Sequence, residues 1–120
     1  MGNKIPFISD KTNMKMALSK ITKNGLGVLI IRNSQKKTIG ILTDGDIKRL
    51  SNDELNFHSL KIMKVMTKNP VSVDKNMLAA HALSLMNTKK ITSLCVHNNK
   101  LKNSTIGFIH IHNILNSNIT

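Results

Sequence analysis

Apolar residues along this chain form short continuous runs that alternate with stretches of helical spacing. A short apolar run predicts a buried strand, whereas apolar residues at i, i+3, i+4 and i+7 predict one face of a helix. Pro6 makes the first strand an edge strand, because proline cannot donate a ladder hydrogen bond. Asn24 and Gly25 predict a left-handed end to the first helix. The first half of the chain therefore predicts strand, helix, strand, strand and helix at residues 5–8, 14–22, 28–31, 38–42 and 44–50.

The same order of elements returns about 65 residues later, which indicates an internal duplication. Pro70 returns where Pro6 stood, and the pair Ala82-Leu83 matches Ala17-Leu18. The second half predicts the same five elements at residues 69–73, 77–86, 94–96, 106–109 and 112–115. The chain is therefore interpreted as two β-α-β-β-α repeats at 5–51 and 69–116, joined by a linker with a short helix at 52–68.

Each repeat joins its first two strands through a helix, so these two strands should be parallel with a right-handed crossover. Such a unit leaves one sheet face open, and two open faces would pack together to close a core. We therefore expect a mixed α/β fold (α+β or α/β) in which the repeats pack pseudo-symmetrically through their sheets. Apolar residues make up 40% of the chain, with three Phe and no Trp or Tyr, so aliphatic residues must build this core.

A candidate binding site lies at residues 39–49, where an apolar run turns directly into a helix. Free backbone N–H groups at a helix N-terminus can hold a phosphate, and the two oxygens of Asp46 can accept hydrogen bonds from both hydroxyls of a ribose. Thr43 and Asp46 also fit a capping box that only stabilises the helix start. Asp44-Gly45 also fits a hairpin turn. The residues alone leave these interpretations open.

The formal net charge of +12 gives a sequence pI near 10.2. A basic excess can indicate nucleic-acid binding. Here the lysines are scattered along the whole length, Arg32 and Arg49 are the only arginines, and no Tyr or Trp is present for base stacking. We therefore expect no specific nucleic-acid partner, and interpret the charge as a field that favours a small anionic ligand.

Cys95 lies in the apolar run 94–96, which predicts a small buried side chain. A single cysteine cannot form a disulfide within the chain, which is typical of a reducing cytoplasm. No apolar run is long enough to span a membrane, and the N-terminus lacks a signal-peptide pattern. These features predict a cytoplasmic protein without a membrane partner.

The two repeats resemble a pair of CBS domains (a Bateman module), in which each repeat ends in Gly-apolar-apolar-Thr-x-x-Asp-apolar. Val65-Met66-Thr67 ahead of Asn69-Pro70 also resembles the phrase that joins the repeats in that family. Within the family the chain is most similar to the C-terminal regulatory region of the arabinose-5-phosphate isomerases. The motifs that carry this closer resemblance are residues 40–49, 82–86, 91–93 and 110–115.

The resemblance implies a parent enzyme that interconverts D-ribulose 5-phosphate and D-arabinose 5-phosphate for the Kdo sugar of lipopolysaccharide. Its catalytic residues would lie in an N-terminal sugar-isomerase domain that is missing here, so we expect no catalytic residue in this chain. The resemblance implies no cofactor, but a nucleotide or CMP-sugar effector such as CMP-Kdo. Alternatives are a stand-alone sensor of adenine nucleotides and an oligomerisation module without a ligand.

A homodimer formed through the CBS pair is also expected by resemblance. A set of apolar residues, rich in methionine, could supply the dimer face, although such a stripe more often belongs to the core. This set is Met63, Met66, Met77, Leu78 and Met86.

By the same resemblance, nucleotides bind in clefts between repeats, with Thr43 on phosphate or ribose and Asp46 on the ribose hydroxyls. In the second repeat His110 stands in place of threonine and Asn113 in place of aspartate, which removes the anionic acceptor. The residues expected to bind the ligand are Thr43, Asp44, Asp46, Thr92, Ser93, His110, His112 and Asn113.

The histidines of the second repeat allow two interpretations. His110 and His112 are two positions apart, so a continuing strand would place them on one side. Two ligands are too few for a zinc site, which favours ligand contact, and we expect no metal. His58, His81 and His97 show no comparable grouping.

Overall fold

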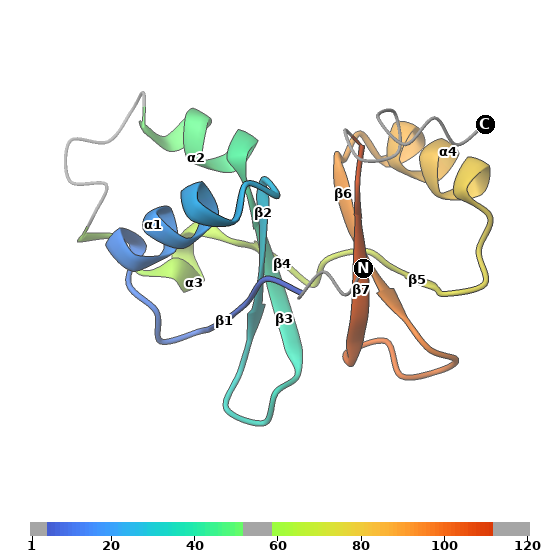
Figure 1. Ribbon diagram of the computed structural model, residues 1–120, viewed down its shortest axis with the longest axis horizontal. Coiled ribbons are helices and arrows are strands. Elements are labelled where there is room, and N and C mark those ends of the chain that lie inside the picture. Colours follow the sequence, from blue (N-terminus) through green and yellow to red (C-terminus); the bar gives the residue numbers. More distant parts are fainter. Residues whose placement is uncertain (1–4, 52–58, 112–120) are drawn as a thin grey trace. The chain divides into compact units, whose positions relative to one another are not determined.

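The computed structural model describes residues 5–51 and 59–111 (Figure 1). Residues up to Asn69 form one compact unit, and residues from Pro70 onward form a second. Each unit contains a small sheet of mixed parallel and antiparallel strands with helices packed against it. The mixed α/β class expected from the hydrophobic pattern is therefore confirmed.

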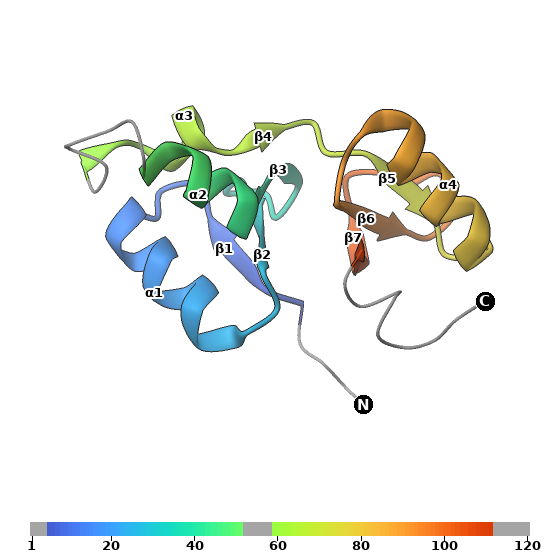
Figure 2. The same ribbon diagram turned by 90° about the horizontal axis from the view of Figure 1, so that it is seen from above.

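The first unit contains a four-stranded sheet in the order β1-β2-β3-β4. The β1 and β2 strands are parallel and joined through a helix, while β3 is antiparallel to both of its neighbours. In both views of the ribbon the helices lie against one face of this sheet (Figures 1 and 2). The elements are β1 (Phe7–Ser9), α1 (Met14–Asn24), β2 (Val28–Arg32), β3 (Thr38–Thr43), α2 (Asp44–Ser51), α3 (Ile62–Val65) and β4 (Thr67–Lys68).

Local sequence signals explain where the α1 helix begins and ends. The Asn13 side chain accepts a hydrogen bond from the backbone N–H of Met16 at 2.8 Å, which is a typical N-cap. At the other end Gly25 adopts the left-handed conformation, with φ of 65°. Both the helix and its left-handed end confirm the sequence prediction.

The core of the first unit lies between the helices and the sheet. The β2 strand has four consecutive apolar side chains with at most 1% exposure, as its continuous apolar pattern predicts, and two of them, Leu29 and Ile31, belong to this core. The cluster that packs the helices on the sheet consists of Ile8, Met14, Ala17, Ile21, Leu29, Ile31, Leu42, Ile62 and Met66.

The β4 strand was not predicted, because the sequence pattern assigned its two residues to the linker. Thr67 and Lys68 are both exposed and carry no alternating pattern, yet they pair with Ile41 and Gly40 of β3. The buried Met66 side chain lies directly over Gly40, where an added Cβ would meet its sulfur at 2.2 Å. The glycine therefore lets Met66 pack closely against the strand that β4 joins.

The second unit contains a three-stranded sheet in the order β5-β6-β7, with β5 parallel to β6 and β7 antiparallel to it. The α4 helix lies against one face of the sheet in both views (Figures 1 and 2). The elements are β5 (Ser72–Asp74), α4 (Ala79–Lys89), β6 (Ser93–His97) and β7 (Thr105–His110). The final helix expected at 112–115 lies outside the described residues.

The strand register shows that the two units are copies of one design. The pair Val28–Thr43 of the first unit corresponds to Ser93–His110 of the second, and each hairpin carries a register shift at the matching place. A bulge at the same step of both ladders is a shared structural feature. The predicted duplication is therefore confirmed at the level of hydrogen-bond pairing.

Cys95 is buried in β6, with 1% of its surface exposed, as the apolar run predicts. Burial raises the pKa of its thiol, and a hydrogen bond with the Thr105 side chain opposes that shift. A buried neutral thiol is a packing group rather than a reactive one.

We predict that Gly40→Ala destabilises the first unit. The new Cβ would lie 2.2 Å from Sδ and 2.8 Å from Cγ of Met66, so this buried side chain would have to move. Overpacking of this kind costs about 1–3 kcal/mol in the free energy of unfolding. The loss should appear as a lower urea midpoint.

Gly107 provides the matched control, because it holds the corresponding position in β7. Its added Cβ would lie 3.7 Å from Cβ of Val96, which is an ordinary contact distance. Gly107→Ala should change the free energy of unfolding by less than about 0.5 kcal/mol. An equal loss in both variants would contradict the role given to Met66.

We predict that Lys90→Gly stabilises the second unit. Lys90 ends α4 in the left-handed conformation with φ of 57°, where the first repeat uses Gly25. A residue with a Cβ in this conformation costs about 1 kcal/mol in the free energy of unfolding relative to glycine. The melting temperature should therefore rise. Lys89→Gly, in the last helical residue, is the control and should lower stability. A decrease for Lys90→Gly would refute the argument.

Candidate ligand-binding site

The first candidate site lies where β3 passes directly into α2. Thr43 and Asp46 form a reciprocal capping box: the Thr43 N–H donates to Oδ2 of Asp46 at 3.0 Å, and the Asp46 N–H donates to Oγ1 of Thr43 at 3.2 Å. The capping interpretation is thus confirmed. The hairpin alternative for Asp44-Gly45 is wrong, because both residues belong to the first turn of α2.

Asp46 is held on both of its carboxylate oxygens. The second oxygen, Oδ1, accepts a hydrogen bond from the Arg49 guanidinium at 2.5 Å. The Asp46 side chain is 15% exposed and that of Arg49 is 73% exposed, so the ion pair lies at the surface. Each carboxylate oxygen has two lone pairs, so these contacts leave Asp46 able to accept further hydrogen bonds.

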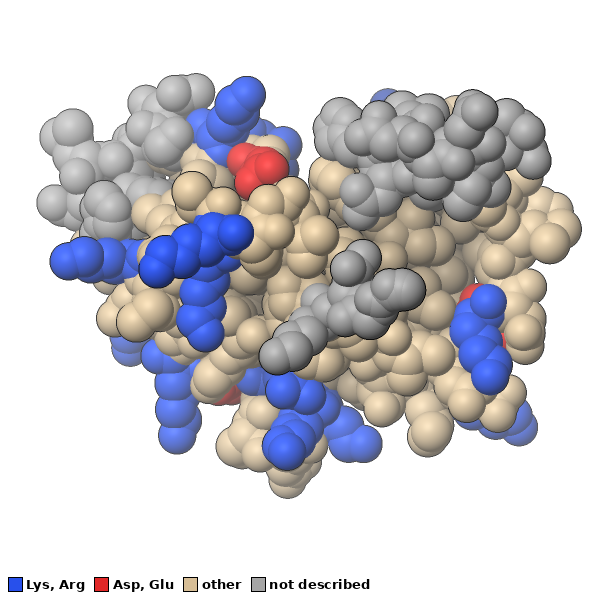
Figure 3. Space-filling view, in the orientation of Figure 1, with Lys and Arg blue, Asp and Glu red and all other residues tan. Residues whose placement is uncertain are grey.

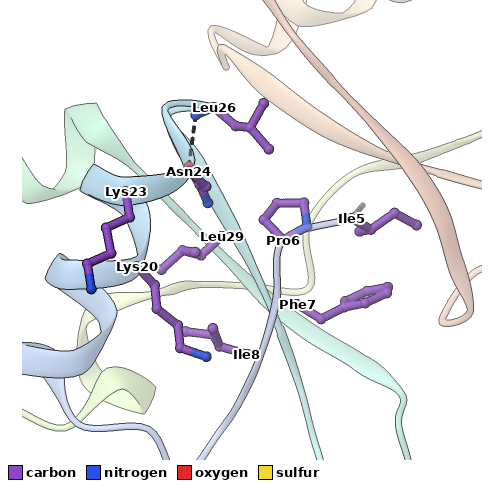
Figure 4. A pocket seen from close by; sticks show the side chains of 9 residues that line it. All are labelled: Ile5, Pro6, Phe7, Ile8, Lys20, Lys23, Asn24, Leu26 and Leu29. Carbon is purple, nitrogen blue, oxygen red and sulfur yellow. Dashed lines mark hydrogen bonds between the residues drawn. The ribbon is translucent and has the colours of Figure 1, made fainter. Parts of the chain in front are cut away.

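A cavity of about 340 Å³ lies in the first unit (Figure 4). Its walls are mostly apolar and come from the start of β1, the end of α1 and the segment that leads into β2. Figure 4 shows the two lysine side chains on the α1 side and the Pro6 ring on the opposite side. The lining residues are Ile5, Pro6, Phe7, Ile8, Lys20, Lys23, Asn24, Leu26 and Leu29.

The loop between α1 and β2 lines the cavity and also bonds to the start of α2. Oδ1 of Asn24 accepts a hydrogen bond from the Leu26 N–H at 2.8 Å, which places Leu26 in the cavity wall. The next residue, Gly27, accepts a hydrogen bond from the Asp44 N–H at 3.0 Å. One short loop thus contributes Leu26 to the cavity wall and holds the start of α2 through Gly27.

The sequence prediction missed every residue of this cavity. A signal was present in Pro6, which precedes the edge strand and lines the cavity, and in the glycine-containing loop around Leu26. Neither signal specifies a cavity, because the wall forms only when β1 pairs with β2 across the chain.

The second repeat places different chemistry at the matching junction. His110 ends β7, and its Nδ1 lies 2.5 Å from Oγ of Ser93, with both side chains buried. Two of the expected site residues are thus brought together. Thr92 is exposed, and its carbonyl accepts a hydrogen bond from the Ile111 N–H at 2.8 Å.

The strand does not continue past His110, because Ile111 is already helical. The strand geometry that would place residues 110 and 112 on one side is therefore not present. His112 and Asn113 lie outside the described residues. Among the described residues no group of three or more His, Cys, Asp or Glu lies close enough to hold a metal ion.

His97 has a partner that the sequence did not reveal. Its Nδ1 lies 2.6 Å from Oγ of Ser72, and only 4% of His97 is exposed. The two residues are far apart in sequence and meet because β5 and β6 pair in parallel. In the first repeat the matching positions hold Phe7 and Arg32, with the guanidinium carbon 3.7 Å from the ring centroid.

Asp74 fixes the loops at one end of the second sheet. Its carboxylate accepts hydrogen bonds from the N–H groups of Asn76 at 2.9 Å and Asn99 at 2.8 Å. The bond from Asn76 is the main cause that lowers the pKa of Asp74 below its usual value. The role of this carboxylate is therefore structural, because it holds the backbone of the turn that follows β5.

The basic side chains visible in Figure 3 lie in several separate places on the face drawn there, with uncharged surface between them.

In the part of the chain that the structure describes, no helix has the length and apolar character needed to cross a membrane.

Comparison with known proteins gives the family. The CBS domain model matches residues 1–53 and 62–118. Arabinose 5-phosphate isomerase KdsD of Yersinia pestis is 33% identical over 118 residues, which are 98% of this chain and 35% of that protein. The chain thus spans about a third of the length of this curated relative. The two matched segments leave no stretch of these 120 residues for a sugar-isomerase domain, so this chain is not itself the isomerase.

Two solved structures share the fold. A CBS domain protein, PAE2072 from Pyrobaculum aerophilum, complexed with AMP, has a TM-score of 0.78 at 18% identity, over 92% of this chain and 85% of its own. The CBS domain pair of protein MJ0100, in complex with 5'-methylthioadenosine and S-adenosyl-L-methionine, has a TM-score of 0.80 at 19% identity. The match covers 95% of this chain and 88% of the MJ0100 chain. With the duplicated register and the family match together, the chain belongs to the CBS-domain family as a pair of CBS domains.

Proposed function

We propose that this CBS pair is the regulatory part of a cytoplasmic arabinose-5-phosphate isomerase and binds a nucleotide or nucleotide sugar such as CMP-Kdo. The observation that carries the proposal is the cavity of the first repeat together with the β3–α2 junction, because one loop lines the cavity through Leu26 and bonds to the junction through Gly27. The 33% sequence identity to an arabinose 5-phosphate isomerase supports the proposal that the parent protein is such an enzyme. The AMP and S-adenosyl-L-methionine complexes of the two structural relatives support a nucleotide-type occupant.

The cavity and the β3–α2 junction would each bind a different part of such a ligand. The apolar cavity has a volume at the low end of the range for small-molecule sites, which suits one ring system rather than a large cofactor. Asp46 provides the acceptor oxygens for the two ribose hydroxyls, and the capping box holds its carboxylate in place before the ligand arrives. Thr43 lies at the same turn for a contact with ribose or phosphate.

Regulation by this ligand requires that the whole enzyme exist in two states with different affinities for it. In a biosynthetic pathway such as that of lipopolysaccharide, an end product that favours the less active state would reduce flux. In this proposal the CBS pair supplies the binding free energy and the isomerase domain supplies the response.

The second candidate function is oligomerisation without a ligand. Met66 and Met86 are buried within the cores, so they are not available for a dimer face. Met63, Met77 and Leu78 remain exposed and favour this candidate. Light scattering of the chain without and with nucleotides separates it from the ligand-binding proposal.

A thermal-shift screen with CMP-Kdo, CMP, AMP, ATP and S-adenosyl-L-methionine tests the ligand class. We predict that CMP-Kdo raises the melting temperature, because a ligand that binds only the folded state stabilises it by mass action. A shift with adenine compounds alone would move the proposal to the sensing of adenine nucleotides. A dimer without any shift would favour the oligomerisation module instead.

We predict that Asp46→Asn and Thr43→Val each weaken binding of the ligand found in that screen. Loss of a charged acceptor costs about 1.5–3 kcal/mol, or about ten- to hundredfold in affinity, and loss of a neutral hydroxyl costs less. Isothermal titration measures both effects. Asp10→Asn, which removes a carboxylate of the same unit away from the junction, should leave the affinity unchanged. Unaltered affinity in both site variants would refute the assigned residues.

A further inference from the structure

The walls of the cavity in the first repeat are asymmetric in charge. Lys20 and Lys23 line it from the α1 side, and none of the nine lining residues is acidic. The two lysines are three positions apart on the helix, so their side chains lie on the same face. The rest of the wall is almost entirely apolar. The cavity thus combines an apolar surface for a ring with two positive charges at one side.

A structural explanation also exists for these lysines. They lie toward the C-terminal end of α1, where positive charge interacts favourably with the helix dipole, and Lys23 belongs to the last turn. The matching helix of the second repeat tests whether the fold itself requires them. It begins at Ala79 where α1 begins at Met14, so its residues at the two lysine positions are Leu85 and Thr88. The helix therefore forms in the same place without either charge.

We infer that Lys20 and Lys23 select an anionic ligand for this cavity and that this selection belongs to the first repeat alone. The ligand class is an apolar ring system that carries a phosphate, because apolar side chains form most of the cavity wall and two lysine side chains lie on its α1 side. The inference rests on the proposed nucleotide-binding function and adds to it. Lys20 and Lys23 distinguish a nucleotide from its uncharged nucleoside.

The experiment compares charged and uncharged forms of the same ligand on charge variants of the protein. The probes are AMP with adenosine and CMP with cytidine, each titrated by calorimetry into the full chain. The variant Lys20→Gln/Lys23→Gln removes both charges from two exposed side chains, and Lys15→Gln removes one from the same helix outside the cavity. Thermal unfolding of each variant tests whether the fold is retained.

We predict that the double variant weakens nucleotide binding about three- to tenfold, as expected for two exposed charge pairs. Nucleoside affinity should stay within about twofold, and Lys15→Gln should change neither. Raising the salt concentration should weaken nucleotide binding to the wild type more than to the double variant, because salt screens exposed charges. This salt comparison decides the matter if the nucleosides bind too weakly to measure.

Three outcomes would overturn the inference, and the third would also overturn the nucleotide-binding proposal. An unchanged affinity for the nucleotide, or an equal loss for nucleotide and nucleoside, would remove the selective role of the lysines and leave the nucleotide-binding proposal intact. If the wild type binds none of the four probes, both the inference and the nucleotide-binding proposal fail for these ligands.

Discussion

The antiparallel pairing of β2 with β3 is the constraint on which the first unit depends. It places four buried apolar side chains of β2 at the centre of the sheet and brings the end of β3 beside the loop before β2. The Gly27 carbonyl in that loop accepts a hydrogen bond from the Asp44 N–H. The α2 helix therefore begins at a position set by the strand pairing. The position of the capping box follows from this register.

The two repeats show how one scaffold can carry different chemistry at matching positions. The end of the hairpin holds Thr43 opposite Val28 in the first repeat and His110 opposite Ser93 in the second. The second pair forms a buried hydrogen bond between its side chains, whereas Thr43 uses its hydroxyl to cap a helix. The backbone is preserved because strand pairing depends on main-chain groups, which leaves the side chains at the ends free to diverge.

The sequence predicted the strands, the main helices and the duplication, because apolar periodicity and turn residues such as Gly25 act locally. It missed β4, whose two exposed residues are ordered only by pairing with β3. It predicted Thr43 and Asp46 as ligand contacts from a local motif, and the structure shows the two residues in a capping box. It also predicted Ser93 and His110, whose side chains meet in the second repeat. It missed the cavity and the Ser72–His97 pair, because these arise from parallel strands that meet only in the folded chain.

The capping box does not compete with a binding role for Asp46. One carboxylate oxygen is fixed by the Thr43 N–H and the other by Arg49, so the side chain has little rotamer freedom left to lose on binding. A group already ordered in the free protein contributes more of its hydrogen-bond energy to affinity than a mobile one. The contacts that stabilise the start of α2 would therefore also prepare Asp46 as an acceptor, and a single carboxylate would serve both the fold and the proposed site.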